Sequence, residues 1–299
     1  MENKNYLIRG IIKKLNIRFS LIDTTTAVND GIILHSCTPV SAVLFGKALT
    51  VAGLMTPLLG DNEKLSVKWE YTGPVSTILV DADDNCRLRG IPGNPALINE
   101  ASSEDELYGD SGKITVMKFK ESQILNSGTA EAAMMEISED ISYYMSTSDQ
   151  IETDFYIAFK LNNTPAEPAE CFCGFMIQEM PGCSLPEFDK LRNRLHSPQT
   201  VELLTDNSIS CTEKLIRILN FITEQNISYE DFISQYEVTF NKTATPVYFC
   251  GCSFEKMKNA VLTLKKEEIL NIIEEEGEVK TSCKFCRKTY SFKKDDFDF

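Results

Sequence analysis

The sequence lacks the motifs of the common nucleotide-dependent and hydrolytic enzymes. It contains no phosphate-binding loop, no glycine fingerprint for a dinucleotide and no G-x-S-x-G nucleophile turn. Only two histidines, His35 and His196, occur in 299 residues, and neither has the spacing of a metal ligand or a catalytic triad. These absences argue against a hydrolase, a kinase or a dehydrogenase, and we expect a protein that is not an enzyme.

Positive charge is also scarce. The chain has 30 Lys and Arg against 44 Asp and Glu, which gives a formal net charge of −14. Residues 246–299 are balanced, so the acidic excess lies in residues 1–245. Such a charge opposes general affinity for nucleic acid or for anionic lipid, and we expect neither nucleic acid nor membrane as a partner.

No segment has the pattern of a signal peptide or of a membrane span. The first five residues are polar, and the longest apolar segment, residues 40–59, contains Lys47 and two glycines. We therefore expect a buried helix there and a cytoplasmic protein. Ten cysteines in the reducing cytosol favour metal-binding or redox-active thiols over structural disulfides.

Residues 1–183 have the pattern of a mixed α and β domain. Thr38 and Pro39 predict the start of the helix over residues 40–59, and Ser138 is predicted to cap a helix that contains Ile137 and Ile141. Alternating apolar residues and turn signals predict strands at residues 65–71, 75–81, 86–91, 113–119, 154–161 and 171–179.

Residues 184–245 have the pattern of a helical linker. Amphipathic helices are expected around residues 188–195 and 215–222, with a further helix at 229–236 and a polar connection that contains Pro198. Short helices are marginal alone, so these must cover an apolar partner, which we expect to be the sheet of the first domain. Their apolar faces carry the candidate interface residues Phe188, Leu191, Leu195, Leu215, Ile218, Leu219 and Ile222.

Residues 246–299 have the pattern of a small cysteine-containing module. Ser253 is predicted to cap a helix at about 254–262, and Gly277 to end a second helix at about 266–275. Val279, Tyr290 and Phe292 predict a hairpin around the second cysteine pair. The predicted fold class is therefore α+β, with an N-terminal sheet domain, a helical linker and a small metal-stabilised module.

Four cysteines in this module predict a metal site. Cys250 and Cys252 are spaced C-x-C, Cys283 and Cys286 are spaced C-x-x-C, and thirty residues separate the pairs. Two such pairs can form a tetrahedral cage for one Zn²⁺ per chain, and no histidine lies nearby to replace a sulfur. The alternatives are a purely structural zinc site and four unrelated buried thiols. Nearby basic residues could contact phosphate, but stabilisation of thiolates is favoured: Lys280, Lys284, Arg287 and Lys288.

A second C-x-C pair, Cys171 and Cys173, lies in a predicted strand with Cys183 nearby. Residues two apart in a strand point to the same face, so two small buried side chains that pack in a sheet are the favoured interpretation. An accessory thiol pair is the alternative.

The cysteine pattern resembles that of the 33-kDa redox-regulated heat-shock chaperone family. Its signature of Cys-x-Cys and Cys-x-x-Cys, about thirty residues apart, matches Cys250-Gly251-Cys252-Ser253 and Cys283-Lys284-Phe285-Cys286. Further segments that look like the family are Gly73-Pro74 to Arg89-Gly90, Ser148-Asp149-Gln150, Met176-Ile177-Gln178 and Pro181-Gly182. The resemblance therefore covers essentially the full chain, and Cys171-Phe172-Cys173 departs from the small residues that relatives tend to carry there.

The resemblance implies an ATP-independent holdase that binds unfolding proteins, and the apolar interface residues of the linker helices are then the candidate client-binding residues. It implies that the reduced form holds zinc on the four C-terminal cysteines and is inactive. Oxidation would join Cys250 to Cys252 and Cys283 to Cys286, unfold the module, loosen the linker and produce a homodimer. The residues support such a switch because thiolates held by zinc are ready nucleophiles towards an oxidant.

Two other functions remain open on the sequence alone. One is a zinc-ribbon protein that binds nucleic acid, against which the negative charge argues. The other is a thiol–disulfide oxidoreductase that uses Cys283 and Cys286. Such an enzyme usually carries its cysteine pair at the start of a helix, whereas the residues from Lys288 to Phe292 favour a strand.

Overall fold

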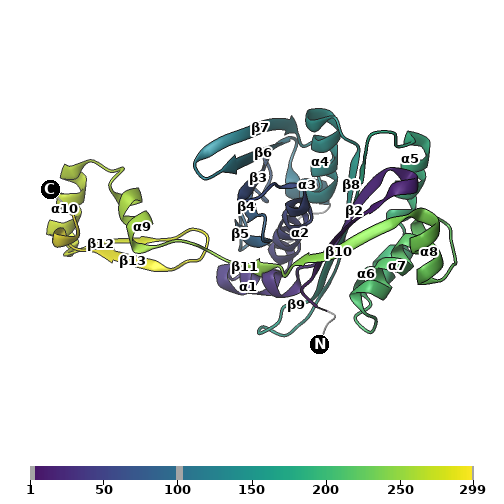
Figure 1. Cartoon of the computed structure of the whole chain (residues 1–299). Helices are drawn as coiled ribbons and strands as arrows, with labels where there is room; N and C mark the ends of the chain where they lie inside the picture. Colours follow the sequence, from purple (N-terminus) through teal and green to yellow (C-terminus); the bar gives the residue numbers. More distant parts are fainter. Residues whose placement is uncertain (1–3, 99–103, 298–299) are drawn as a thin grey trace. The chain divides into compact units, whose positions relative to one another are not determined.

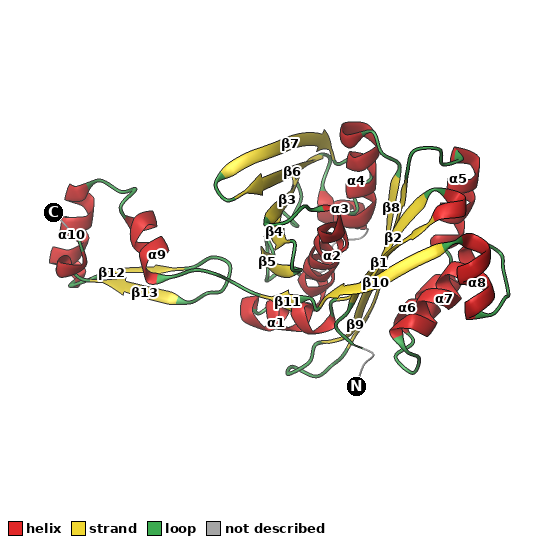
Figure 2. Ribbon diagram, in the orientation of Figure 1, coloured by secondary structure: helices red, strands yellow, loops and turns green. Residues whose placement is uncertain are grey.

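The computed structural model describes residues 4–98 and 104–297 of the chain. The chain divides into two units, Met1–Tyr248 and Phe249–Phe299. The first unit contains two β-sheets with their covering helices, and the second contains a hairpin and two helices (Figures 1 and 2).

The first sheet is antiparallel and takes its strands from both ends of the first unit. Its spatial order is β10 (Val238–Ala244), β1 (Leu7–Ile12), β2 (Ile17–Asp23), β9 (Ala169–Glu179) and β8 (Thr153–Leu161). β1 and β2 form a hairpin, and β10 pairs with the other edge of β1. The linker helices thus lie between two strands of this sheet in the sequence.

The second sheet lies on the opposite side of the central helix (Figure 1). Its spatial order is β11 (Val247–Tyr248), β5 (Arg87–Ile91), β4 (Thr77–Asp83), β3 (Glu63–Tyr71), β6 (Gly112–Lys120) and β7 (Gln123–Glu131). Neighbouring strands are antiparallel except for β11 and β5, which are parallel. The six strands predicted in the first domain are confirmed, with bounds that differ by at most two residues.

Helix α2 (Pro39–Met55) is buried between the two sheets. As predicted, Thr38 is its N-cap, whose hydroxyl accepts a hydrogen bond from the backbone N–H of Ser41, and Pro39 is its first residue. The helix is apolar on all sides because it contacts strands of both sheets. The segment Pro39–Leu58 is long and apolar enough to cross a membrane, but 78% of its apolar window is buried in the unit, as in a core helix.

The other helices of residues 1–183 are shorter. They are α1 (Thr25–His35), α3 (Glu104–Tyr108) and α4 (Ile137–Tyr144), with helical turns at Lys13–Leu15, Thr56–Leu58 and Met145–Asp149. The prediction that Ser138 caps α4 is wrong. The N-cap is Glu136, two residues earlier, and its carboxylate accepts hydrogen bonds from the backbone N–H groups of Ser138 and Glu139.

Four linker helices cover the face of the first sheet that is turned away from α2 (Figure 1). They are α5 (Leu185–Leu195), α6 (Pro198–Thr205), α7 (Cys211–Ile222) and α8 (Tyr229–Tyr236). Two details differ from the prediction. Pro198 begins α6 instead of lying in a connection, because proline fits the first turn of a helix, and residues 238–244 form strand β10.

The second unit contains α9 (Phe254–Val261), α10 (Lys266–Glu276) and a hairpin of β12 (Val279–Ser282) and β13 (Thr289–Phe292), followed by a turn at Lys294–Asp296. Ser253 caps α9, and Gly277 ends α10 with a φ of 81°, as predicted. The core of the unit is small. It consists of Val261, Ile269, Val279, Cys283, Tyr290, Phe292 and Phe297, with partly buried side chains around them.

Candidate metal centre and linker interface

The second cysteine pair lies in the tight turn of the hairpin. The backbone N–H of Cys283 donates to the carbonyl of Lys288 at 3.0 Å, and the N–H of Arg287 donates to the carbonyl of Cys283 at 2.8 Å. Arg287 has a positive φ of 56°, which closes the turn. These bonds direct the sulfurs of Cys283 and Cys286 towards the same side of the loop.

The first cysteine pair, Cys250 and Cys252, precedes helix α9. The hydroxyl of Ser253 accepts a hydrogen bond from the N–H of Lys256 at 3.2 Å, and the Lys256 ammonium donates to the carbonyl of Gly251 at 2.7 Å. The helix start thus fixes the short segment that carries Cys250 and Cys252.

The four sulfur atoms lie within 4.8 Å of one another. The sulfur of Cys250 lies 3.7 Å from that of Cys283, and the sulfur of Cys252 lies 3.3 Å from that of Cys286. Four sulfurs bound tetrahedrally to zinc at about 2.3 Å would be roughly 3.8 Å apart, so the arrangement fits a metal ion bound by sulfur alone. The chain therefore has a possible four-cysteine metal site where the sequence predicts one.

The electrostatics of the cluster also favour a bound cation. Burial opposes ionisation of the Cys252 thiol, but hydrogen bonds from Tyr290 and the neighbouring thiols outweigh it and lower its pKa to about 7. Burial is the main cause that raises the pKa of Cys286 to about 12. Thiolates this close repel one another, so all four ionise together only when a cation balances their charge.

The predicted client-binding side chains lie together under the linker helices. Each is at most 4% exposed: Phe188, Leu191, Leu195, Leu215, Ile218, Leu219 and Ile222. They belong to one apolar cluster with side chains of the first sheet, among them Phe19, Leu21 and Phe175. This cluster is separate from the core around α2, because the sheet lies between the two. Their role in binding clients stays a prediction.

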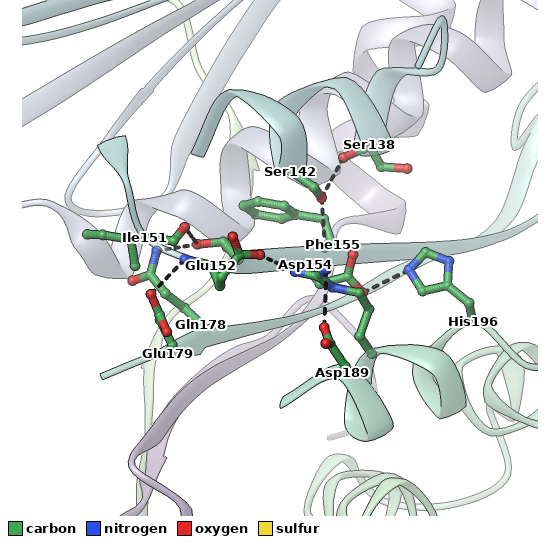
Figure 3. A network of polar contacts seen from close by, with 12 residues as sticks. Ser138, Ser142, Ile151, Glu152, Asp154, Phe155, Gln178, Glu179, Asp189 and His196 are labelled. Carbon is green, nitrogen blue, oxygen red and sulfur yellow. Dashed lines mark hydrogen bonds and ion pairs between the residues drawn. The ribbon is translucent and has the colours of Figure 1, made fainter. Parts of the chain in front are cut away.

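Polar contacts also hold helix α5 to strand β8 (Figure 3). Nε2 of His196 lies 2.8 Å from Oδ2 of Asp154, whose side chain is 7% exposed, and Arg192 forms an ion pair with Glu152 at 2.5 Å. The hydrogen bond with Asp154 is the main cause that raises the pKa of His196. Sequence reasoning missed the contact between His196 and Asp154 because the two residues are 42 positions apart in the chain.

Cys171 and Cys173 face the linker helices from strand β9. Both are fully buried with their sulfurs 3.4 Å apart, as expected for side chains that pack on one face of a sheet, and Cys183 is half-buried. Lys214 of α7 is 1% exposed, and its ammonium donates to the carbonyl of Leu204 at 2.6 Å and lies 4.0 Å from Cys173 Sγ. Sequence reasoning missed this buried lysine, although its position four residues before Ile218 placed it on the apolar stripe.

The fold and the site together define a class of protein in which helices cover one face of a sheet domain and a separate four-cysteine module follows. The family model described as Hsp33 protein matches residues 5–293. The chain belongs to the Hsp33 family of chaperones.

Relatives and a solved structure agree with this assignment. A 33 kDa chaperonin of Geobacillus sp. (strain WCH70) is 27% identical over 98% of this chain and 96% of the relative. The 33 kDa chaperonin of Bacillus subtilis (strain 168) is 26% identical over 98% of this chain and 97% of the relative. The crystal structure of a 33 kDa chaperonin from Thermotoga maritima has the same fold, with a TM-score of 0.80, 22% identity and coverage of 98% and 96% of the two chains.

Proposed function

We propose that this chain is a redox-regulated, ATP-independent holdase of the cytoplasm. In its reduced form it holds one zinc ion and is inactive. Under oxidative stress it exposes apolar surface, forms a homodimer and binds unfolding proteins before they aggregate. The protein does this without enzymatic turnover and without nucleic acid as a partner.

The observation that carries this proposal is the cluster of four sulfurs in a module with little core of its own. Bound zinc would cross-link the two cysteine pairs and keep their sulfurs deprotonated. Apart from Cys283, six buried side chains supply the rest of the core. Structural zinc contributes roughly 10–16 kcal/mol of apparent binding energy in small peptides, so a module of this size depends on its thiolates staying reduced.

Oxidation would remove these ligands. Two thiols and one hydrogen peroxide yield a disulfide and two waters, so two equivalents of peroxide oxidise the four cysteines. Family resemblance favours the pairs Cys250–Cys252 and Cys283–Cys286. Across the two pairs, the sulfurs of Cys250 and Cys283 lie 3.7 Å apart and those of Cys252 and Cys286 lie 3.3 Å apart, so mapping the disulfides distinguishes the two pairings.

The chain segment between the module and the linker helices connects unfolding of the module to release of the helices. Strands β10 and β11 are the regular elements of this segment, and β11 ends two residues before Cys250. The Tyr248 hydroxyl donates to the carbonyl of Gly90 at 3.1 Å and lies 3.2 Å from Nε2 of His35. Unfolding of the module would release this short strand first, and the linker helices would follow.

Release of the linker helices would expose two apolar surfaces at once. The helix faces and the sheet face that they cover are buried in the closed protein. A monomer rarely exposes a contiguous apolar patch of more than a few hundred Å², so this surface would bind unfolded chains and favour dimerisation.

The test is a titration of the reduced, zinc-loaded protein with peroxide. Zinc release, free thiols, oligomeric state and suppression of client aggregation should change together, and peptide mapping should identify the disulfides. A variant with all four C-terminal cysteines replaced by Ser is the control, because peroxide cannot form these disulfides in it. Holdase activity that appears with zinc and thiols intact would contradict the proposal, and salt-dependent retention on RNA would favour nucleic-acid binding instead.

A further inference from the structure

A cavity of about 640 Å³ lies on the face of the first sheet turned towards α2, at the point where that helix ends. Strands β1, β2 and β10 form its floor, and Pro57 and Leu58 of the turn after α2 form one wall. Its polar lining includes Arg9, Arg18 and Ser20. The cavity is on the opposite face of the sheet from the linker helices, so it is separate from the surface described above.

The strand register brings the polar side chains of the cavity together. Arg9 lies opposite Ser20 on one neighbouring strand and opposite Asn241 on the other. Directly opposed residues point to the same face of an antiparallel sheet, so these three form one row across β10, β1 and β2. Arg18 lies two residues before Ser20 and therefore points to the same face from the next row.

These polar groups have no partners within the described part of the chain. Neither Arg9 nor Arg18 makes an ion pair or side-chain hydrogen bond there, although the chain has 44 acidic residues against 30 basic ones. Ser20 is 1% exposed, and its hydroxyl has no hydrogen-bond partner. Nε of Arg18 is likewise buried without a partner. A buried polar group without a hydrogen-bond partner lowers stability by about 1–3 kcal/mol, so these groups destabilise the fold unless a ligand binds to them.

We infer that the cavity binds a small molecule in which a carboxylate or phosphate group is attached to an apolar body. Two guanidinium groups can grip an oxyanion through paired N–H donors, and the Ser20 hydroxyl and Asn241 amide add neutral donors. Pro57 and Leu58 provide apolar contact beside them. The volume falls within the roughly 300–1,000 Å³ that is usual for small-molecule sites.

Calorimetric titration of the reduced full-length protein at low salt tests the inference. The probes are hexanoate, its uncharged amide hexanamide, and inorganic phosphate. Saturable binding of hexanoate but not of hexanamide is expected for a carboxylate site, and displacement of hexanoate by millimolar phosphate identifies a site that also accepts phosphate. Binding of phosphate alone assigns the site to phosphorylated ligands.

Variants show whether the binding occurs in this cavity. Arg18→Gln should weaken binding by about 10- to 100-fold, as expected for loss of a charge-assisted hydrogen bond. Arg217→Gln is the matched control, because Arg217 is half exposed on α7 and pairs with Glu213. Ser20→Ala should also weaken binding while leaving the thermal midpoint of the unliganded protein unchanged or higher, since it removes an unpartnered hydroxyl.

Arg9→Gln, at a more exposed position, provides the same test if Arg18→Gln fails to fold. Absence of saturable binding by both anions would overturn the inference. So would equal binding by hexanamide and hexanoate, or full affinity in the folded arginine variants.

Discussion

Replacing two buried leucines of α7 by serine is expected to release the linker helices in the reduced protein. Leu215 and Leu219 are each fully buried in the cluster between the helices and the sheet. Truncation of a buried leucine to alanine costs about 2–5 kcal/mol, so the pair costs roughly 4–10 kcal/mol before the two new hydroxyls are counted. Local opening cannot cost more than global unfolding, which is about 5–15 kcal/mol for a domain. The loss is therefore comparable to the whole stability of a domain, and we expect it to open the linker.

The expected result is holdase activity without oxidation. Aggregation of a heat-unfolded client, followed by light scattering under strong reductant, should be suppressed by the variant and not by the parent protein. Zinc content should remain at about one per chain, because the substitutions lie in the first unit and the cysteines in the second. Hydrogen exchange should show loss of protection in the linker helices.

A matched substitution in the other core separates linker release from general instability. Leu49 of α2 is also fully buried, but it packs in the cluster between the two sheets. Leu49→Ala and Leu215→Ala remove the same atoms from equally buried sites. Only Leu215→Ala should raise the activity of the reduced protein, and Leu49→Ala should lower the thermal midpoint without activating it.

One outcome would refute the reasoning. If the double serine variant is inactive while exchange shows that its linker is open, the surface under the linker is not the activating feature. The module itself would then be the inhibitor, and its unfolding would be required directly.

Three further outcomes are expected. Protein purified under reductant should contain about one zinc per chain, Cys283→Ser should lower this sharply, and full zinc in a variant without the four C-terminal cysteines would exclude the site. Peroxide should remove exchange protection mainly beyond residue 184 and spare α2; uniform loss along the chain would contradict the proposed switch. The raised pKa of His196, caused chiefly by its hydrogen bond to Asp154, means that the charged pair stabilises α5 fully below about pH 6.5 and is lost as the pH rises through the folded-state pKa. Protection of α5 should therefore fall with rising pH in the parent protein and show less pH dependence in His196→Asn.

Local signals were sufficient to predict much of the molecule. Thr38 and Pro39 start α2, and Ser253 and Gly277 bound the helices of the second unit, because each acts on backbone groups a few residues away. The cysteine spacing predicted the sulfur cluster for the same reason, since each pair lies in one short turn. The amphipathic pattern of α7 predicted its buried face.

Features that depend on distant parts of the chain could not be predicted in this way. Strand β10 is a polar edge strand, and it is a strand because it pairs with β1, more than 225 residues earlier. Strand β7 is also at an edge and almost entirely exposed, so no alternation marked it. The His196–Asp154 contact and the cavity lined by Arg9 and Arg18 arise only when separate strands and helices meet.

The position of β10 constrains what the linker can do once it is released. Strand β9 ends at Glu179 and β10 begins at Val238, so residues 180–237 are bounded by two strands of one sheet. While both strands stay paired, the freed segment is a closed loop of 58 residues and not a tail. Closing a loop of this length costs roughly 3–4 kcal/mol of chain entropy, so the segment gains less conformational entropy on unfolding than a free tail would. The loop also keeps its apolar side chains beside the sheet face they left, so reclosure is intramolecular and its rate should not depend on protein concentration.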